Sequence, residues 1–392
     1  MTVTKRSSAL AGAAFLMATS AIGPGFLTQT TVFTQSLLAS FGFVILISIV
    51  LDIGAQLNIW RMLTQTEMHA QVLANHVLPG LGYFLAFLIL AGGLVFNIAN
   101  MGGCGLGMSV VTGFSNEVGA GISCIVALTL FWIKEFGKAL DVFTKWLGIT
   151  MIVLTLYVAI ASQPPLVEAV FRTFIPEKID ALAIVTLVGG TVGGYISFAG
   201  AHRLLAAGMK GKENLPAVSK SAVSGIIITG VMRIILFLAV LGVVSSGAML
   251  TSTNPAASVF QHAAGTIGFK FFGVVMWCAA ITSVVGCAYT SVSFLQGLHP
   301  FFDRHQRGMI SFFIILSCGF FLYLGNPVRL LVSAGAINGL ILPIALAVVL
   351  IAATSQTLKR NYQHPRWLML FGWLVVIAMS SMSVMALLKW LS

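Results

Sequence analysis

Apolar residues run along this chain in long, nearly continuous stretches, and short segments between the stretches carry most of the charges. The stretches are about 20 residues or longer, the length an α-helix needs to cross a bilayer. A β-barrel would instead alternate polar and apolar positions over roughly ten residues. The pattern therefore predicts an all-α polytopic membrane protein with eleven spans, at residues 9–39, 41–60, 80–112, 118–133, 140–162, 181–208, 219–246, 266–297, 309–325, 328–354 and 367–391.

Composition excludes the main soluble classes. Hydrophobic residues make up 58% of the 392 positions and charged residues only 8%, whereas soluble domains carry about 25% charged residues. This argues against a soluble enzyme, a nucleic-acid-binding module and a disordered chain. The sequence contains no Walker loop, HExxH motif or nucleophile triad, so we expect neither an enzyme nor a cofactor.

The net charge of +11 has an explanation in membrane topology. The basic residues lie in the gaps between apolar runs, and cytoplasmic loops collect Lys and Arg. We therefore expect a protein of the cell membrane with a cytoplasmic N-terminus. The expected cytoplasmic side carries Lys5, Arg6, Arg61, Lys134, Lys138, Arg203, Lys210, Lys212, Lys220, Arg304, Arg307, Lys359, Arg360 and Arg366; the other side carries Arg172, Lys178, Lys270, Arg329 and Lys389.

Two spans carry glycine-rich breaks at matching places. The first contains Gly23-Pro24-Gly25, and the sixth contains glycines from Gly189 to Gly194. Gly193 in the sixth span lies 170 residues after Gly23 in the first. Five spans start with each break, which is typical of an inverted repeat whose broken helices form a transporter's substrate site. The alternative is that these glycines serve helix packing. We predict one transmembrane domain, 1–392, made of a first repeat (9–162), an inverted second repeat (181–354) and an extra helix (367–391).

The residues at these breaks resemble those of the NRAMP family of secondary metal transporters, over about residues 9–355. Where metal-transporting members have Asp-Pro-Gly-Asn, this chain has Gly23-Pro24-Gly25-Phe26, eleven residues after Gly12-Ala13-Ala14. The family's Gly-Ala-Thr-Val-Met-Pro-His reads Gly189-Gly190-Thr191-Val192-Gly193-Gly194-Tyr195, and its third-span Asp-x-x-Glu reads Asn97-Ile98-Ala99-Asn100. The resemblance implies a LeuT-type fold, with discontinuous first and sixth helices, that works by alternating access.

The same resemblance shows that the family's functional residues are replaced. The ion-binding Asp, Asn and Met of metal-transporting members correspond to Gly23, Phe26 and Gly193, and the acids implicated in proton passage correspond to Asn97 and Asn100. A divalent transition ion normally needs a charged ligand, which these side chains do not offer. We place the acids Asp52, Glu135 and Asp141 toward the cytoplasmic ends of their spans. Transport of Mn²⁺, Mg²⁺ or Fe²⁺ stays open as the alternative function.

We expect the replacements to enlarge the site, with hydroxyl and amide groups left to bind a solute. Half-helix N-termini also present free N–H groups to a carboxylate. The sequence therefore favours a secondary transporter, such as a symporter, of a small organic solute such as an amino acid or a small carboxylate. Branch members resembling this chain are often encoded beside 5-oxoprolinase genes, which makes 5-oxoproline a specific candidate. The predicted substrate-binding residues are Gly23, Pro24, Gly25, Phe26, Thr28, Gln29, Thr30, Gly189, Gly190, Thr191, Gly193, Gly194, Tyr195, Asn97, Asn100 and Asn338.

Three further residues are candidates for charge balance or coupling: Asp52, His202 and Arg233. A charge such as Arg233 in mid-span is costly and by default functional, although the side chain could also extend to the membrane surface. His202 could relay protons or simply lie at a cytoplasmic helix end, and Asn338 could serve helix–helix hydrogen bonding. The expected partners are the solute, the lipid bilayer and a proton or other coupling ion, without nucleic acid or a side-chain metal site. A channel-like or regulatory protein is the remaining class.

Overall fold

The computed structural model describes residues 22–296, 298–355 and 362–391, and throughout these ranges the regular structure is helical. The α-helices are α2 (Pro24–Leu37), α3 (Phe41–Thr66), α4 (Ala70–Val77), α5 (Leu81–Thr112), α6 (Asn116–Trp132), α7 (Lys134–Ala161), α8 (Leu166–Phe174), α9 (Ala181–Thr191), α10 (Tyr195–Ala206), α11 (Leu215–Ser245), α12 (Pro255–Ser293), α13 (Pro300–Arg304), α14 (Gln306–Leu324), α15 (Pro327–Thr354) and α17 (Arg366–Leu391). Two short 3-10 helices are η1 (Leu38–Ser40) and η2 (Lys212–Asn214).

Each predicted span contains a helix, but fewer stretches meet a strict criterion for crossing a membrane. Within the described ranges, eight helical stretches are long and apolar enough, or nine if the bent pair of α7 and α8 is one span. The count falls below eleven because α2 and α3 continue through η1 as one stretch, and because α6 has only 17 residues. Residues 9–21 of the first predicted span lie outside the described part.

Two helices differ from their predicted bounds for a physical reason. α3 continues to Thr66, six residues beyond the apolar run, because most of its last turn is also buried, including Gln65, whose Nε2 donates to the carbonyl of Gly211 at 2.9 Å. α12 begins at Pro255, eleven residues early, and is interrupted at Gly265, whose φ of +61° is open to glycine. Hydropathy does not mark the end of α3, since packed helices tolerate buried polar groups that have partners. The start of α12 is set by Asn254, whose side chain accepts the N–H of Ala257, with Pro255 following as the first helical residue.

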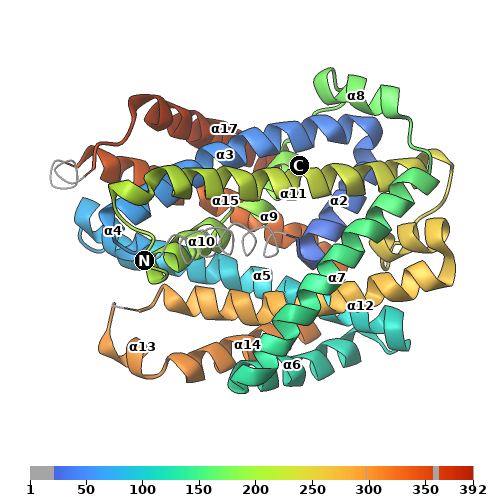
Figure 1. The fold of residues 1–392 in the computed structure, drawn as a ribbon, viewed down its shortest axis with the longest axis horizontal. Coiled ribbons are helices and arrows are strands. Elements are labelled where there is room, and N and C mark those ends of the chain that lie inside the picture. The colour runs from blue at the N-terminus through green and yellow to red at the C-terminus, as the bar shows by residue number, and fades with distance from the viewer. Residues whose placement is uncertain (1–21, 297, 356–361, 392) are drawn as a thin grey trace.

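The helices surround the broken pair α9 and α10. α5 packs along α12 and α15, α9 packs on α15, and α3 packs on α11. The stretch from α9 to α10 is the most thoroughly buried of the apolar stretches, whereas α14 and α17 lie largely at the surface (Figure 1). The interior therefore lies around the sixth predicted span.

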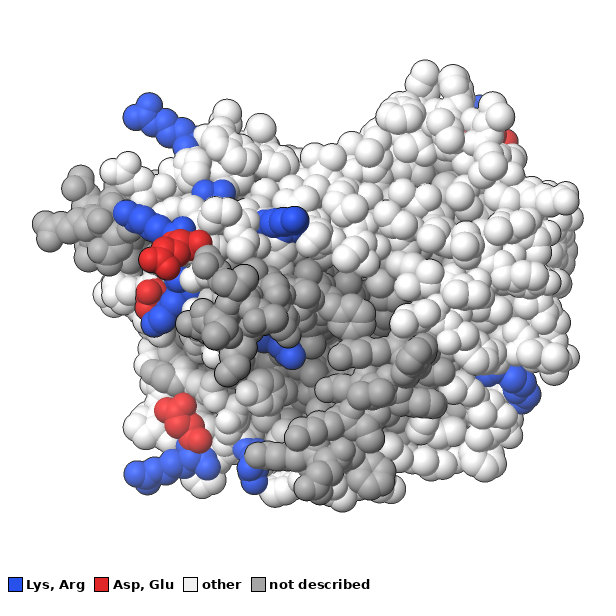
Figure 2. All heavy atoms as spheres, viewed as in Figure 1, with Lys and Arg blue, Asp and Glu red and all other residues white. Residues whose placement is uncertain are grey.

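The outer surface is that of a protein bathed in lipid. Large apolar side chains such as Phe87, Ile125, Ile160 and Leu370 are exposed on the outside of the bundle. Most of the Lys, Arg, Asp and Glu side chains visible in Figure 2 gather at one end, the end at which α4, α10 and α13 lie in Figure 1. An exposed apolar girdle with charges toward its ends suits a bilayer.

Candidate functional site

The sixth predicted span is broken at the predicted place. α9 ends at Thr191 and α10 begins at Tyr195, and both Val192 and Gly193 donate their N–H to the carbonyl of Val188, at 2.9 and 3.1 Å. Gly194 then turns the chain with φ +48° and ψ −114°, a conformation that strains any residue with a Cβ. The discontinuity of this helix is therefore confirmed.

The first predicted break coincides with a helix start. α2 begins at Pro24, after Gly23 in an extended conformation without a side-chain cap. Residues before 22 lie outside the described part, so the helix expected on the other side of this break stays a prediction. α2 is buried almost throughout, including Thr28 and Thr30, and Pro24 at its start packs where a Cβ on Gly103 of α5 would lie, at 2.4 Å.

The glycines of the sixth span serve close packing. A Cβ on Gly189 would lie 1.9 Å from the carbonyl oxygen of Gly335, and one on Gly190 would lie 2.6 Å from Oε1 of Gln29. The space that we expected these glycines to open is thus filled by the α15 backbone and by a side chain of α2. The packing alternative applies at Gly189, whose neighbour Gly339 completes a small-residue pair four positions after Gly335.

Two buried amides connect the break to its surroundings. Gln29 donates from Nε2 to the carbonyl of Leu331 at 2.8 Å, and Asn338 donates from Nδ2 to the carbonyls of Gly92 and Ala334 at 3.0 and 2.9 Å. Their oxygens, Oε1 of Gln29 and Oδ1 of Asn338, are buried without a hydrogen-bond partner. A Cβ on Gly194 would lie 1.8 Å from Oδ1 of Asn338, so this oxygen faces the break.

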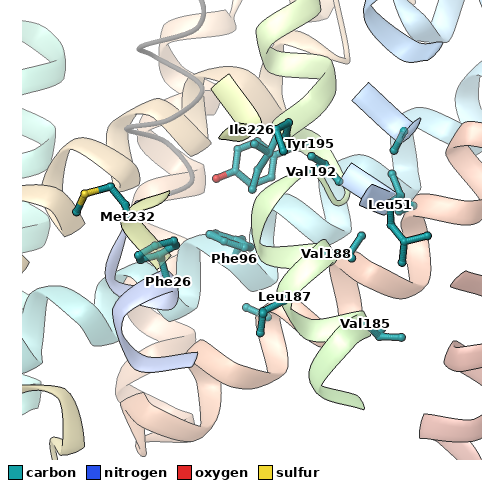
Figure 3. Packing of buried hydrophobic residues seen from close by; sticks show 14 of the residues in the cluster. Phe26, Leu51, Phe96, Val185, Leu187, Val188, Val192, Tyr195, Ile226 and Met232 are labelled. Atoms are coloured by element: carbon teal, nitrogen blue, oxygen red, sulfur yellow. The ribbon is translucent and has the colours of Figure 1, made fainter. Parts of the chain in front are cut away.

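Aromatic side chains from three helices surround the same region. Phe26, Phe96 and Tyr195 are all buried, and the rings of Phe96 and Tyr195 meet edge to face with centroids 5.5 Å apart. Figure 3 shows these three residues with Val192 and Met232 around the break. The sequence prediction included Phe26 and Tyr195 but missed Phe96, whose only signal was its place beside Asn97 in the third span.

Arg233 of α11 reaches the break from the side. Its guanidinium carbon lies 4.5 Å from the ring centroid of Phe26, and its Nη1 donates to Oγ1 of Thr191 at 3.1 Å. The side chain is 2% exposed. Of the two predicted positions for Arg233, the structure therefore has the one inside the protein and not the one at the membrane surface. The Nε and Nη2 groups are buried without hydrogen-bond partners.

Asp52 lies deeper than the sequence suggested. We placed it toward a cytoplasmic end, but α3 runs to Thr66 and puts Asp52 near its middle, almost fully buried. Its Oδ1 has no hydrogen-bond partner, and Arg233 is the charged group that acts on it electrostatically. The two charges therefore face a common interior region.

The two amides of the third span, Asn97 and Asn100, have different surroundings. Asn97 donates from Nδ2 to Oγ of Ser317 on α14, at 3.1 Å, and so joins α5 to α14. Asn100 is fully buried, and neither its Oδ1 nor its Nδ2 has a partner. Asn100 lies four residues from Phe96, hence on the same face of α5, the face that meets Tyr195.

His202 lies away from the break, near the end of α10. Its Nε2 accepts the N–H of Ala70 at 3.3 Å, and its ring stacks on His69 with centroids 4.3 Å apart. Burial lowers the pKa of His69, which lies between α3 and α4. These contacts join α10 to the start of α4 and match the interpretation of His202 as a helix-end residue.

The sequence analysis missed Trp60, which packs against α10 after the break. Its Nε1 donates to the carbonyl of Ser197 at 2.8 Å, and its ring fills the space where a Cβ on Gly200 would lie. Trp60 thus fixes α10 to α3. Within the described ranges, no group of three or more His, Cys, Asp or Glu side chains is arranged to hold a metal ion.

Known proteins resemble this chain over its whole length. The model of the natural resistance-associated macrophage protein-like family matches residues 14–389. An uncharacterized membrane protein, YcsG of Bacillus subtilis, is 58% identical and covers 97% of this chain and 94% of its own length. An uncharacterized membrane protein of Haemophilus influenzae is 54% identical and covers 100% of this chain and 98% of its own length.

Solved structures show the same fold at low identity. A variant of the Eremococcus coleocola manganese transporter superposes with a TM-score of 0.72 at 15% identity, covering 98% of this chain and 88% of its own. Mhp1, a nucleobase-cation-symport-1 family transporter in a closed conformation with bromovinylhydantoin bound, gives a TM-score of 0.63 at 15% identity, with 97% and 91% covered. These likenesses confirm the expected LeuT-type architecture.

Proposed function

The chain belongs to the natural resistance-associated macrophage protein-like (Nramp) family of membrane transporters, and we propose that it carries a small polar organic solute by alternating access. An amino acid or a small carboxylate, such as 5-oxoproline, suits the groups at the break. The observation that supports this choice over a metal ion is the position of Arg233, whose guanidinium contacts both Phe26 and Thr191.

A buried guanidinium opposes a divalent cation at this place. Phe26 stands where metal-transporting relatives have an ion-binding Asn, and the charge of Arg233 lies 4.5 Å from its ring centroid. A dication roughly 6 Å from a positive charge is repelled by about 5 kcal/mol at an effective dielectric constant of 20. Asp52 offsets part of this repulsion, but one carboxylate that also balances Arg233 leaves no surplus negative charge.

The unpartnered polar groups around the break suit an organic solute instead. Oε1 of Gln29, Oδ1 of Asn338 and the amide of Asn100 are buried without partners, and such groups cost free energy until something hydrogen-bonds to them. Aromatic walls with a few convergent polar groups are typical of small-molecule sites. The fold holds such ligands elsewhere, since Mhp1 is a transporter with bromovinylhydantoin bound.

The contacts of the two half-helices support a rocking movement. α9 packs by its glycines on α15, whereas α10 is tied to α3 by Trp60 and to α4 by His202. The segment from Val192 to Gly194 joins them. Both half-helices also contact α3, so alternating access would move the contact of α9 with α15 relative to the contact of α10 with α4, with the break as the hinge.

We infer that the charge-rich end faces the cytoplasm of the cell, as the positive-inside rule requires. Asp52 is the buried acid best placed to couple transport to a proton. Counterflow in proteoliposomes with an imposed pH difference tests this: proton coupling changes the accumulation of the solute, and an Asp52→Asn variant abolishes that change.

The second candidate function is divalent metal transport. It is favoured by the family and by one of the structural neighbours, the Eremococcus coleocola manganese transporter. In that case backbone carbonyls and Asp52 would have to supply the ligands, with Arg233 displaced. The same break would serve as the path, so the two functions differ in substrate and not in architecture.

A ligand screen of the purified protein separates the two. Thermal unfolding in detergent is followed with Mn²⁺, Mg²⁺, a set of amino acids and small carboxylates that includes 5-oxoproline. A ligand at 100 times its dissociation constant stabilises the folded state by about 2.7 kcal/mol. Stabilisation by an organic solute supports the proposal, and stabilisation by a divalent metal alone overturns it.

A further inference from the structure

We propose that Arg233 binds the carboxylate of the transported solute through its Nε and Nη2 groups, and that Asp52 is the counter-charge of the empty site. The inference rests on the proposed function and specifies the chemical group of the solute. It follows from the hydrogen bonding of the guanidinium, from the two elements that hold it and from the separation of the two charges.

The free edge of the guanidinium can bind both oxygens of a carboxylate. Nη1 is taken by Thr191, at 3.1 Å, while Nε and Nη2 are buried and without partners. Nε and Nη2 lie side by side on one edge of the planar group, so their N–H bonds run parallel. Such an edge matches the two oxygens of a carboxylate and gives a bidentate charge-assisted pair.

Contacts from both breaks fix the direction of this edge. The ring of Phe26, two residues after the start of α2, stacks against the guanidinium, and Thr191 is the last residue of α9. The free edge is therefore positioned by the same two elements that are expected to move in transport. A carboxylate bound to this edge would be coupled, through Arg233, to both α2 and α9.

Asp52 does not supply the missing hydrogen-bond partners of Arg233. Among the described residues Arg233 has no ion pair within 4.0 Å, although Asp52 acts on it electrostatically. Oδ1 of Asp52 also lacks a partner. Two opposite charges that attract but do not bond are costly in a protein interior, and a ligand carboxylate on the free edge would supply the missing hydrogen bonds.

Matched acids and amides test the chemical group. The probes are 5-oxoproline with its primary amide and succinate with succinamide, whose dissociation constants are measured from the thermal stabilisation of the protein. We expect the acid of at least one pair to bind about tenfold or more tightly than its amide. An amide keeps the shape of the acid but loses the charge and one acceptor.

Variants locate the group that makes this distinction. In Arg233→Lys and Arg233→Gln we expect acid and amide to bind within about threefold of each other, because the fork is lost in both and the charge in one. Asp52→Asn should strengthen acid binding, since it removes a repelling carboxylate. Arg203→Gln, which removes an exposed Arg after His202 on α10, is the control and should behave as the unchanged protein.

The outcomes separate this inference from the proposed function. Equal binding of acids and amides, or full discrimination in a folded Arg233→Gln protein, overturns the carboxylate site while an organic substrate stands. Stabilisation by Mn²⁺ and by none of the organic probes overturns both. A thermal transition in each variant without ligand establishes that it is folded.

Discussion

Replacing Gly194 with Ala tests whether the break at residues 192–194 is built as described. Gly194 has φ +48° and ψ −114°, and a Cβ there would lie 1.8 Å from Oδ1 of Asn338. The substitution therefore strains the backbone and displaces Asn338 at once.

The two effects have separate magnitudes. A residue with a Cβ in a glycine-only conformation costs about 1–3 kcal/mol. Displacing Asn338 also disturbs its bonds to the carbonyls of Gly92 and Ala334, each worth about 1 kcal/mol. We expect Gly194→Ala to lower the free energy of unfolding by about 3–5 kcal/mol.

Gly121→Ala is the matched control, because nothing lies within 4 Å of a Cβ at Gly121 in the middle of α6. We expect that variant to be unchanged or more stable by up to about 1 kcal/mol. Both proteins are compared by thermal unfolding in detergent and by solute uptake in proteoliposomes. Equal stability and equal uptake of the two variants would refute the described turn at Gly194.

Three further predictions concern pH, helix attachment and the first break. Burial lowers the pKa of His364 to about 4 from its ordinary 6.5. Because the pKa is lower in the folded state than in the unfolded state, the neutral ring favours the folded state by up to about 3 kcal/mol. This stability is present above pH 6.5 and is lost as pH falls to 4. Unfolding measured against pH should show this loss, and His364→Gln should flatten it. Trp60→Phe removes the bond to the Ser197 carbonyl and should cost about 1–3 kcal/mol and slow uptake; wild-type behaviour in both would show that α10 does not depend on this bond. Gly23→Asp places a negative charge at the start of α2 and should weaken binding of organic acids in the same thermal assay, and unchanged affinity argues against a site there.

The sequence predicted the architecture well because periodic hydropathy and glycine placement are local signals. The break in the sixth span and the start of α2 lie where the glycines indicated. The LeuT-type fold also followed, although from the resemblance of short motifs and not from hydropathy. The end of α3 was missed because buried polar residues such as Gln65 continue a helix that hydropathy ends, and the start of α12 was missed because a capping residue, Asn254, sets it.

The candidate site was harder to predict because it depends on what lies opposite each residue. Gly189 looks the same in a sequence whether it opens a cavity or admits the carbonyl of Gly335. Arg233 could be snorkelling or buried until α11 was placed beside Phe26 and Thr191. Asn97 and Asn100 share one motif, yet only Asn97 has a partner across the helix interface. Such pairings join residues far apart in the chain.

The most direct test of the account is transport by the purified protein in proteoliposomes, with labelled Mn²⁺ and a labelled small carboxylate offered in parallel. The buried guanidinium of Arg233 beside the break predicts saturable counterflow of the carboxylate and no saturable uptake of Mn²⁺. Saturable Mn²⁺ uptake, unaffected by organic acids, would contradict the account and make the chain a metal carrier.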